Sequence, residues 1–413
     1  MKHPTPSAPS TAILATLGAL ATLATLGSLA APAHAADGPT VTISGFGTAA
    51  LTASDTEDAE FARPNQASGV RKDARTGVDS NLGVQATARI SDSLSFTAQG
   101  LARKSARDHY GAELAWAFAK FKLNDGLSLR VGRIGLPVYM ISDFRNVGYA
   151  NTMMRPPAEV YRQVTADSFD GADLVYQHSF GDTSVTAQFG IGNSSTDMPG
   201  GSELKFKPAT AIHLVAENGP FSLRFGRADA KFTLANNTSI DTLLATLNRV
   251  GLAQVARDLD VTDVDGSFTS LGFTMDYKNF LVQSEYAVRR TDSRVVMDTS
   301  SYYAMLGYRY GKVTPYYYYG NIKRDADRTY AGVPTTGPLA AVGAAVNSAV
   351  RAALQSNHAV GVRWDFHKSA ALKVQLDHIA PREGAGAFIN ASPAFQAGGG
   401  AVNVYAAGID FVF

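Results

Sequence analysis

Cysteine is absent from the sequence, and neither sign of charge is in clear excess. Without cysteine the chain cannot form disulfide frameworks, thiolate nucleophiles or cysteine-based zinc sites. The 37 Lys and Arg residues nearly balance the 36 Asp and Glu residues, so the whole chain has no net attraction for nucleic acid or anionic lipid. A mean hydropathy of -0.06 also argues against a bundle of membrane helices. Any electrostatic field that serves a function must therefore be local.

Recognisable catalytic motifs are also missing. The sequence contains no G-x-S-x-G nucleophile elbow, no H-E-x-x-H helix and no P-loop. Asp377 and His378 are adjacent, but neighbours on a strand point to opposite faces and cannot form a dyad. The sequence therefore predicts a protein that is not an enzyme and predicts neither a cofactor nor a metal site. A catalytic triad assembled across the fold is the alternative.

The first 35 residues have the features of a secretory signal peptide. Lys2 and His3 precede the apolar stretch "TAILATLGALATLATLGSLAAPAHA", which ends in a small-x-small pattern. We expect cleavage after Ala35 and export to the cell envelope, and a retained membrane anchor is the alternative. Removing residues 1–35 takes away one lysine and no acid, so the mature chain, residues 36–413, is formally neutral.

The mature chain contains many short stretches in which apolar and polar residues alternate. In "LSLRVGR", Leu127 and Val131 fall on one face of a strand and Arg130 falls on the other. The segments "FSLRFGR" (221–227) and "LKVQLDHI" (372–379) repeat this pattern. A soluble β-sandwich would bury the apolar face, whereas a transmembrane barrel would turn it toward lipid and its polar face toward a water-filled lumen. Alternation alone permits both folds.

Connection lengths distinguish these two folds, because seven very short polar turns alternate with much longer connections. The short turns begin at Ser91, Asn124, Gly181, Asn218, Lys278, Gly311 and His367, and the long connections include 134–169, 230–266, 323–356 and 381–400. Tight turns on one rim and long loops on the other are typical of an outer-membrane barrel. Seven hairpins and one strand at each end predict 16 strands, an even number that closes without an exposed edge and leaves an aqueous channel.

Aromatic residues mark the predicted strand ends. The final residues, "VYAAGIDFVF", place Ile409, Phe411 and Phe413 on one face of the closing strand. Other aromatic residues lie beside the short turns, as an interfacial girdle would: Phe121, Phe180, Phe280, Tyr308, Tyr310, Tyr316 and Phe366. With the ending "GIDFVF", the strand-to-loop phrase "LRVGRIGLPVYMISDFRNVGY" and the strand pair "YRYGKVTPYYYYG", the chain resembles the Gram-negative outer-membrane porins.

This resemblance implies an all-β transmembrane barrel in the outer membrane, with its third external loop folded into the pore. It implies a channel for passive diffusion of small hydrophilic solutes and ions, and a homotrimer in outer-membrane lipid. It also implies that Phe413 is the signal read by the outer-membrane assembly machinery. The acidic loop motif of the enterobacterial general porins is absent, which leaves ion preference open. The alternatives are a channel selective for a particular anion, small carboxylate or sugar, and a non-conducting structural or adhesion barrel.

The connection 134–169 is the predicted constriction loop, and prolines within it would stiffen its course. Its charged residues include Asp143, Arg145, Arg155, Glu159 and Arg162. Strand alternation turns three arginines toward the lumen from the second, third and fifth strands: Arg89, Arg103 and Arg130. We expect these arginines to form one side of an eyelet and the loop residues to form the other, so that anions are attracted. Alternatively, the arginines only solvate the lumen or pair with wall acids.

Two of the long connections contain helix-like spacing. The segment "SIDTLLATLNRVGLAQVARDL" lies within 230–266, and "PLAAVGAAVNSAVRAAL" lies within 323–356. We expect both inserts to pack external loops against one another. A lid or a partner-docking surface is the alternative.

Overall fold

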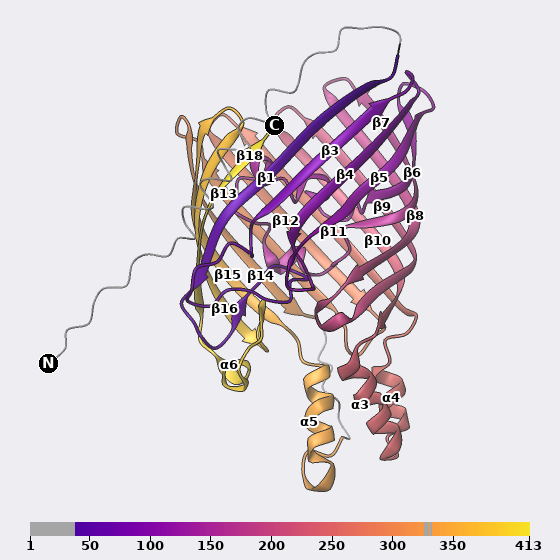
Figure 1. Cartoon of the computed structure of the whole chain (residues 1–413), viewed down its shortest axis with the longest axis vertical. Helices are drawn as coiled ribbons and strands as arrows, with labels where there is room; N and C mark the ends of the chain where they lie inside the picture. The colour runs from indigo at the N-terminus through magenta and orange to yellow at the C-terminus, as the bar shows by residue number, and fades with distance from the viewer. Residues whose placement is uncertain (1–37, 326–329, 331–332) are drawn as a thin grey trace, which may run out of the picture.

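Sixteen strands form a closed antiparallel β-barrel (Figure 1), which confirms the predicted number. The computed structural model describes residues 38–325, 330 and 333–413, and the predicted signal peptide, 1–35, lies outside them. Strand β1 (Thr40–Ser54) closes the barrel by pairing with β18 (Val402–Val412). Closure leaves the wall without an unpaired edge, as lipid requires.

The bounds of the remaining elements follow the chain. Between β1 and β18 the wall consists of β3 (Asn81–Arg89), β4 (Leu94–Lys104), β5 (Tyr110–Lys122), β6 (Leu127–Gly135), β7 (Ser168–Phe180), β8 (Thr183–Asp197), β9 (Glu203–Asn218), β10 (Phe221–Ala235), β11 (Val264–Tyr277), β12 (Phe280–Thr291), β13 (Thr299–Tyr308), β14 (Val313–Arg324), β15 (Leu354–His367) and β16 (Ala370–Glu383). Outside the wall lie β2 (Glu60–Phe61) and β17 (Phe388–Ile389), which pair with each other. The described α-helices are α2 (Ala158–Tyr161), α3 (Thr238–Arg249), α4 (Ala253–Leu259), α5 (Ala340–Ala349) and α6 (Pro393–Gly398).

Short turns and long loops lie at opposite rims of the barrel. The seven predicted short turns join neighbouring strands at the upper rim in Figure 1, where the C-terminus also lies. We number the connections of the other rim in chain order: L1 (55–80), L2 (105–109), L3 (136–167), L4 (198–202), L5 (236–263), L6 (292–298), L7 (325–353) and L8 (384–401). The predicted asymmetry between the two rims is therefore confirmed.

Side chains alternate between the outside and the inside of the wall. On β15 and β16, Val360 and Val374 are 52% and 51% exposed on the outside, whereas Gln375 and Asp377 are buried inside. In a membrane, lipid covers such outward apolar side chains, and the polar side chains face the lumen. The wall is therefore apolar outside and polar inside, the reverse of a soluble sandwich.

The seam between β1 and β18 depends on two glycines. A Cβ atom at Gly45 would lie 2.2 Å from the ring of Phe413, and one at Gly47 would lie 2.5 Å from the ring of Phe411. The backbones of Gly45 and Phe413 exchange two hydrogen bonds of 2.8 and 3.0 Å. The terminal aromatic rings therefore lie directly over β1, in space that any larger residue at these positions would fill.

Aromatic side chains gather beside the short turns, with one exception to the prediction. The exposed members of the girdle are Phe121, Phe180, Phe280, Tyr308, Tyr310 and Phe366. Tyr316 is only 5% exposed, and its hydroxyl donates a 2.7 Å hydrogen bond to Gln375. Placing Tyr316 in the girdle was wrong because Pro315 and Tyr317 occupy the outward positions of β14, and alternation turns Tyr316 into the barrel.

Helices α3, α4 and α5 project from the long-loop rim (Figure 1). The side chains of Leu247, Leu259 and Val346 are fully buried in one apolar cluster that joins L5 to L7. The side chain of Asn237 caps α3 by accepting a hydrogen bond from the backbone N–H of Ile240. The two helical inserts therefore pack against each other. None of the described helices is long and apolar enough to span a membrane.

Candidate functional site

Loop L3 lies inside the barrel and packs against one side of the wall. Its buried side chains Val138, Tyr139 and Val160 share an apolar cluster with Phe268 of β11 and Tyr303 of β13. The ring centroids of Tyr139 and Phe268 are 5.0 Å apart. Because L3 occupies the side of the lumen next to β11 and β13, the open side lies along the wall strands that precede L3 in the chain.

Polar side chains of the wall bind the backbone of L3. They make the following hydrogen bonds: Arg224 to Met140 O (2.6 Å), Ser270 to Val138 O (2.7 Å), Met140 N to Glu285 (3.0 Å), Met154 N to Gln375 (3.0 Å), and Arg363 to Tyr149 O and Asn151 O (2.7 and 2.8 Å). A loop buried in a barrel has few backbone partners, so these side chains satisfy its N–H and C=O groups. The position of L3 is therefore specified at many points along β10 to β16.

Arg155 attaches the middle of L3 to two buried acids. Its guanidinium donates to both oxygens of Asp79 at 2.9 and 2.7 Å and to Asp377 at 2.7 Å. Burial lowers the pKa of Arg155, but the two carboxylates outweigh burial and raise it above its ordinary value. Burial raises the pKa of Asp79, and Arg155 outweighs this effect and lowers it below its ordinary value. Arg155 and Asp79 are therefore both charged at neutral pH. We call the group of Arg155, Asp79 and Asp377 the Arg155 clamp.

Lys373 provides a second buried attachment. Its ammonium donates to Gly148 O at 2.8 Å and to Met153 O at 3.0 Å, and it pairs with Asp410 at 2.8 Å. The side chain of Lys373 is fully buried. Thr48 of β1 donates to the same carboxylate of Asp410. Lys373 therefore connects two points of L3 to the barrel seam.

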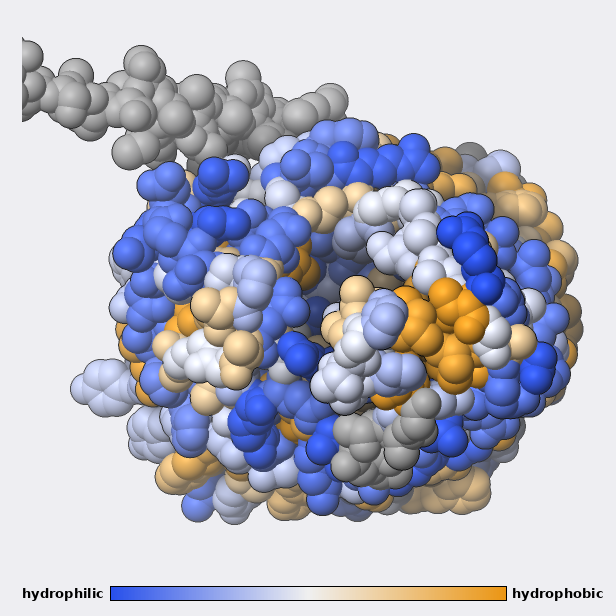
Figure 2. Space-filling view, turned by 90° about the horizontal axis from the view of Figure 1, so that it is seen from below, coloured by the Kyte–Doolittle hydropathy of each residue, from blue (hydrophilic) through white to orange (hydrophobic). Residues whose placement is uncertain are grey.

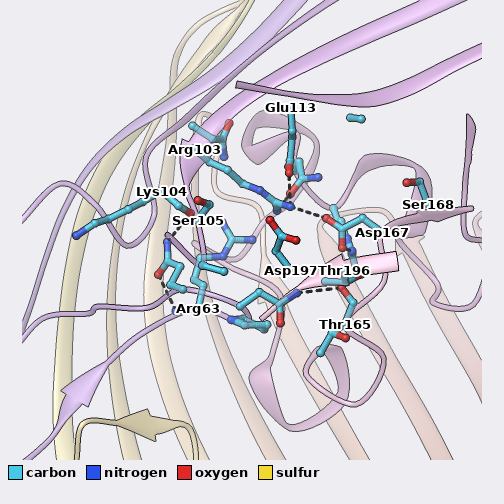
Figure 3. A pocket seen from close by; sticks show the side chains of 18 of the residues that line it. Arg63, Arg103, Lys104, Ser105, Glu113, Thr165, Asp167, Ser168, Thr196 and Asp197 are labelled. Atoms are coloured by element: carbon cyan, nitrogen blue, oxygen red, sulfur yellow. Dashed lines mark hydrogen bonds and ion pairs between the residues drawn. The ribbon is translucent and has the colours of Figure 1, made fainter. Parts of the chain in front are cut away.

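The open side of the lumen contains a cavity of about 490 Å³. Its lining comes mainly from L1, L2, L3 and the long-loop ends of β4 to β8 (Figure 3). Seen from the long-loop rim, the molecule is hollowed, and both hydrophilic side chains and an apolar patch border the hollow (Figure 2). This volume is in the range of sites that hold small molecules.

Arg103 bridges the wall and L3 across this cavity (Figure 3). Its guanidinium lies 2.8 Å from Glu113 of β5 and 2.8 Å from Asp167 of L3. Arg145 of L3 pairs with the other oxygen of Asp167. This row of four charges alternates in sign, so each arginine keeps an acid as a neighbour while it faces the cavity.

Basic residues outnumber acidic residues on the cavity lining. The basic residues are Arg63, Arg103, Lys104, Arg107, Arg133, Arg145 and Arg155, and the acidic residues are Glu113, Asp143, Asp167, Asp170 and Asp197. All of these form ion pairs except Arg63 and Asp143. In the part of the chain that the structure describes, the side chains of Arg63 and Asp143 make no hydrogen bond or ion pair. They are therefore the lining charges most available to a solute.

Four arginines lie close enough in this region to influence one another. Burial lowers the pKa of Arg63 to about 10. Repulsion by Arg103 and Arg155 also lowers this pKa, whereas attraction by Asp79 raises it. Burial also lowers the pKa of Arg145 to about 10, and repulsion by Arg103 and Arg63 contributes in the same direction. Both groups remain protonated at neutral pH. An anion in the cavity would reduce this repulsion.

Four of the eight predicted eyelet residues line the cavity: Arg103, Asp143, Arg145 and Arg155. Glu159 and Arg162 do not, because α2 turns them toward the wall and L8. Glu159 is 1% exposed and accepts a hydrogen bond from Gln355 of β15. Arg162 donates to Gly386 O of L8 at 3.0 Å. The structure therefore corrects their predicted place at the eyelet.

Arg89 and Arg130 are also distant from the cavity. Asn81, at the start of β3, pairs with Arg103. Arg89 is the last residue of β3 and lies eight residues, about 26 Å along the strand, from Asn81. Arg130 makes two hydrogen bonds to Asp173 and pairs in register with Lys120, nearer the short-turn rim. The predicted cluster of three arginines was wrong because alternation gives the face of a residue but not its height in the barrel.

Sequence reasoning missed Arg63, which lies in L1. This loop has no hydrophobic periodicity that would indicate its course, so nothing in the sequence placed it over the cavity. The structure also tests for metal sites: no group of three or more His, Asp or Glu side chains in the described residues is arranged to hold a metal ion.

Comparisons with known proteins agree on one fold. A family model described as Gram-negative porin matches residues 19–384. The anion-selective porin from Comamonas acidovorans is 14% identical with a TM-score of 0.57, over 91% of this chain and 100% of that chain. OmpF of Salmonella typhi in complex with daunomycin is 14% identical with a TM-score of 0.55, over 91% and 98%. The trimer form of OmpT from Vibrio cholerae is 16% identical with a TM-score of 0.51, over 91% and 100%. A sequence search of curated proteins finds no match.

Proposed function

This chain belongs to the Gram-negative porin family, and from this premise we propose that solutes cross it through the cavity between L3 and the wall strands β4 to β8. The protein is an outer-membrane channel for passive diffusion, and its family and fold are those of non-enzymatic channels. The loops L1 to L8 face the outside of the cell and the short turns face the periplasm. Small hydrophilic solutes and ions are the molecules that such a channel passes.

The position of L3 is the main observation that supports this proposal. The Arg155 clamp and Lys373 hold L3 against the wall from β10 to β18, so L3 cannot close the other side of the lumen without breaking buried ion pairs. The charged lining of the remaining cavity favours water and hydrophilic solutes over apolar ones. The ion pair between Arg103 on the wall and Asp167 on L3 therefore borders the passage.

We also propose a modest preference for anions. Seven basic and five acidic residues line the cavity, and the two acids that pair with Arg155, Asp79 and Asp377, are not part of the lining. Selectivity depends on the few charges at the narrowest point, so this local excess counts for more than the neutrality of the whole chain. The similar fold of the Comamonas acidovorans protein, whose description calls it anion-selective, is consistent with this preference.

The absence of cysteine provides a direct test of the passage. Single cysteines at Ser105 and Asn146 would lie on the cavity lining, and a matched cysteine at Ser301 would lie beneath L3, where the native side chain is fully buried. We expect a small charged thiol reagent to reduce the current through the first two variants and to leave the third unchanged. Equal block at Ser301→Cys, or no block at Ser105→Cys and Asn146→Cys, would place the passage elsewhere.

A homotrimer is the assembly we propose, with the outer face of β3 to β5 at its contacts. Outward positions on these strands include the small exposed residues Ala86, Ala98 and Ala112, beside larger ones such as Phe96 and Leu114. Small side chains allow two walls to approach closely. The trimer form described for OmpT of Vibrio cholerae has the same fold.

The two remaining partners that we propose are outer-membrane lipid and the assembly machinery. Lipid would cover the exposed apolar side chains of the wall, such as Val360 and Val374. Phe413 is 46% exposed beside Gly45 at the seam, where the assembly machinery could reach it before the barrel closes. Replacing Phe413 by glycine should lower the amount of folded protein in the outer membrane, measured by heat modifiability on gels, and unchanged amounts would contradict this role.

A further inference from the structure

We propose that Arg63 is a carboxylate-binding residue of the passage and that L8 holds it in place through L1. This inference rests on the proposed function, because Arg63 can select a solute only if the cavity is the solute path. None of the eight residues predicted at the eyelet is Arg63, and neither L1 nor L8 was predicted to reach the passage.

The state of its guanidinium distinguishes Arg63 from the other basic residues of the lining. The other six each form an ion pair with an acid: Arg103, Lys104, Arg107, Arg133, Arg145 and Arg155. The side chain of Arg63 has neither an ion pair nor a hydrogen bond to any described residue. Its donors are therefore available to a solute without first breaking a protein contact.

The surroundings of Arg63 favour an anion. Arg103 and Arg155 act on it with like charge, and the nearby acid Asp79 is already bound by Arg155 through both of its oxygens. A half-buried cation without its own acid is incompletely compensated. A carboxylate that enters the cavity would supply the missing partner, and it would not need to displace Asp79.

The backbone that carries Arg63 is firmly held. Its N–H donates a 3.0 Å hydrogen bond to the side chain of Gln66. The amide of Gln66 in turn donates to Gly77 O at 3.0 Å and to Val78 O at 3.1 Å. Because Gln66 is only 5% exposed, these bonds are shielded from water. Arg63 is therefore presented to the cavity from a fixed turn of L1.

Loop L8 supports this turn of L1. Strand β2, which ends two residues before Arg63, pairs with β17 of L8 through Phe61 and Phe388. The rings of Phe61 and Phe388 are 6.0 Å apart in an edge-to-face arrangement, and the guanidinium of Arg155 lies 4.8 Å from the centroid of the Phe61 ring. Phe61 therefore connects L8 and L3 at a point adjacent to Arg63.

The chemistry of arginine indicates the class of ligand. A guanidinium presents two parallel N–H donors that match the two oxygens of a carboxylate, whereas a spherical anion such as chloride engages them less completely. The cavity of about 490 Å³ can hold a small dicarboxylate. We therefore expect small carboxylates to bind during passage, and succinate is a suitable probe.

The experiment measures the single-channel current in a constant potassium chloride background while succinate is added. We expect the current to fall along a saturating curve in the wild type, and the midpoint to move to about tenfold higher succinate in Arg63→Gln, because a charge-assisted hydrogen bond is lost. Arg63→Lys should give an intermediate midpoint, since an ammonium keeps the charge and loses the paired donors. Arg309→Gln is the matched control, because it removes a paired arginine beside a short turn, away from the cavity lining, and should leave the midpoint unchanged.

A second variant tests the support from L8. Phe388→Ala removes the ring that contacts Phe61, so we expect weaker succinate block in the wild-type background and no further loss in the Arg63→Gln background. Additive effects would show that L8 acts independently of Arg63. Discrete channel currents with no saturation, or an unchanged midpoint in Arg63→Gln, would overturn the inference and leave the channel intact. A folded barrel without any current would instead overturn the proposed function.

Discussion

Replacing Arg155 by methionine tests how L3 is held, because this substitution removes the cation of a buried clamp and keeps much of its length. Asp79 and Asp377, each 1% exposed, would remain buried without their shared partner. Removal of one partner from a buried ion pair costs about 3–5 kcal/mol, chiefly because the other charge is left uncompensated. We expect the free energy of unfolding of Arg155→Met to fall by about this amount.

The assay combines thermal unfolding in detergent micelles with single-channel recording. Arg155→Met should unfold at a lower temperature and give a noisier open-channel current, because L3 loses its central attachment. Arg162→Met is the matched control, since Arg162 reaches only a carbonyl of L8. Adding Asp79→Asn and Asp377→Asn to Arg155→Met should recover part of the stability. A variant Arg155→Met with wild-type unfolding temperature and current noise would refute this account of L3.

The same clamp predicts the effect of acid. The pKa of Asp79 lies below its ordinary value, so the clamp contributes fully above pH ~4 and is lost as the pH falls through the pKa of the folded state. We therefore expect the current noise of the wild type to increase only in strong acid. An increase between pH 5 and 7 would require a different titrating group.

Three further predictions concern single residues. Asp143→Asn removes the unpaired acid of the lining and should shift the reversal potential further toward anion preference, and a shift toward cations would contradict the assignment. Burial raises the pKa of Glu159, so the wild type should gain stability as the pH falls from neutral toward 4.5, and Glu159→Gln should lack this gain in melts across that range. Ala98→Trp should abolish trimers in cross-linking and Ala304→Trp, on the far wall, should not; equal effects would place the interface elsewhere.

The wall of the barrel could be predicted from the sequence because its signals are local. Alternation gives the face of each residue, as for Val131 outside and Arg130 inside, and the short turns give the number of strands. Tyr316 lies near a turn, but the alternation of its own strand turns its side chain into the barrel. Local signals therefore predicted the strands more reliably than the orientation of individual side chains.

The proposed passage could be predicted only in part, because its lining depends on contacts between residues distant in the chain. The connection expected to form the constriction lies inside the barrel, and four of the eight residues expected at the eyelet line the cavity: Arg103, Asp143, Arg145 and Arg155. The height of Arg89 and Arg130 depends on strand register, which the spacing within one strand does not specify. Arg63 reaches the cavity because L1 pairs with L8, more than 300 residues away, and no pattern within either loop indicates that pairing.

The central claim is that this barrel conducts through the cavity beside Arg103, with a preference for anions. Its most direct test is the single-channel current of the refolded mature protein in a planar bilayer under a salt gradient. We predict discrete current steps and a reversal potential with the sign of anion preference, which becomes smaller in Arg63→Gln. A folded barrel that never conducts, or one whose reversal potential indicates cations in both proteins, would contradict the claim.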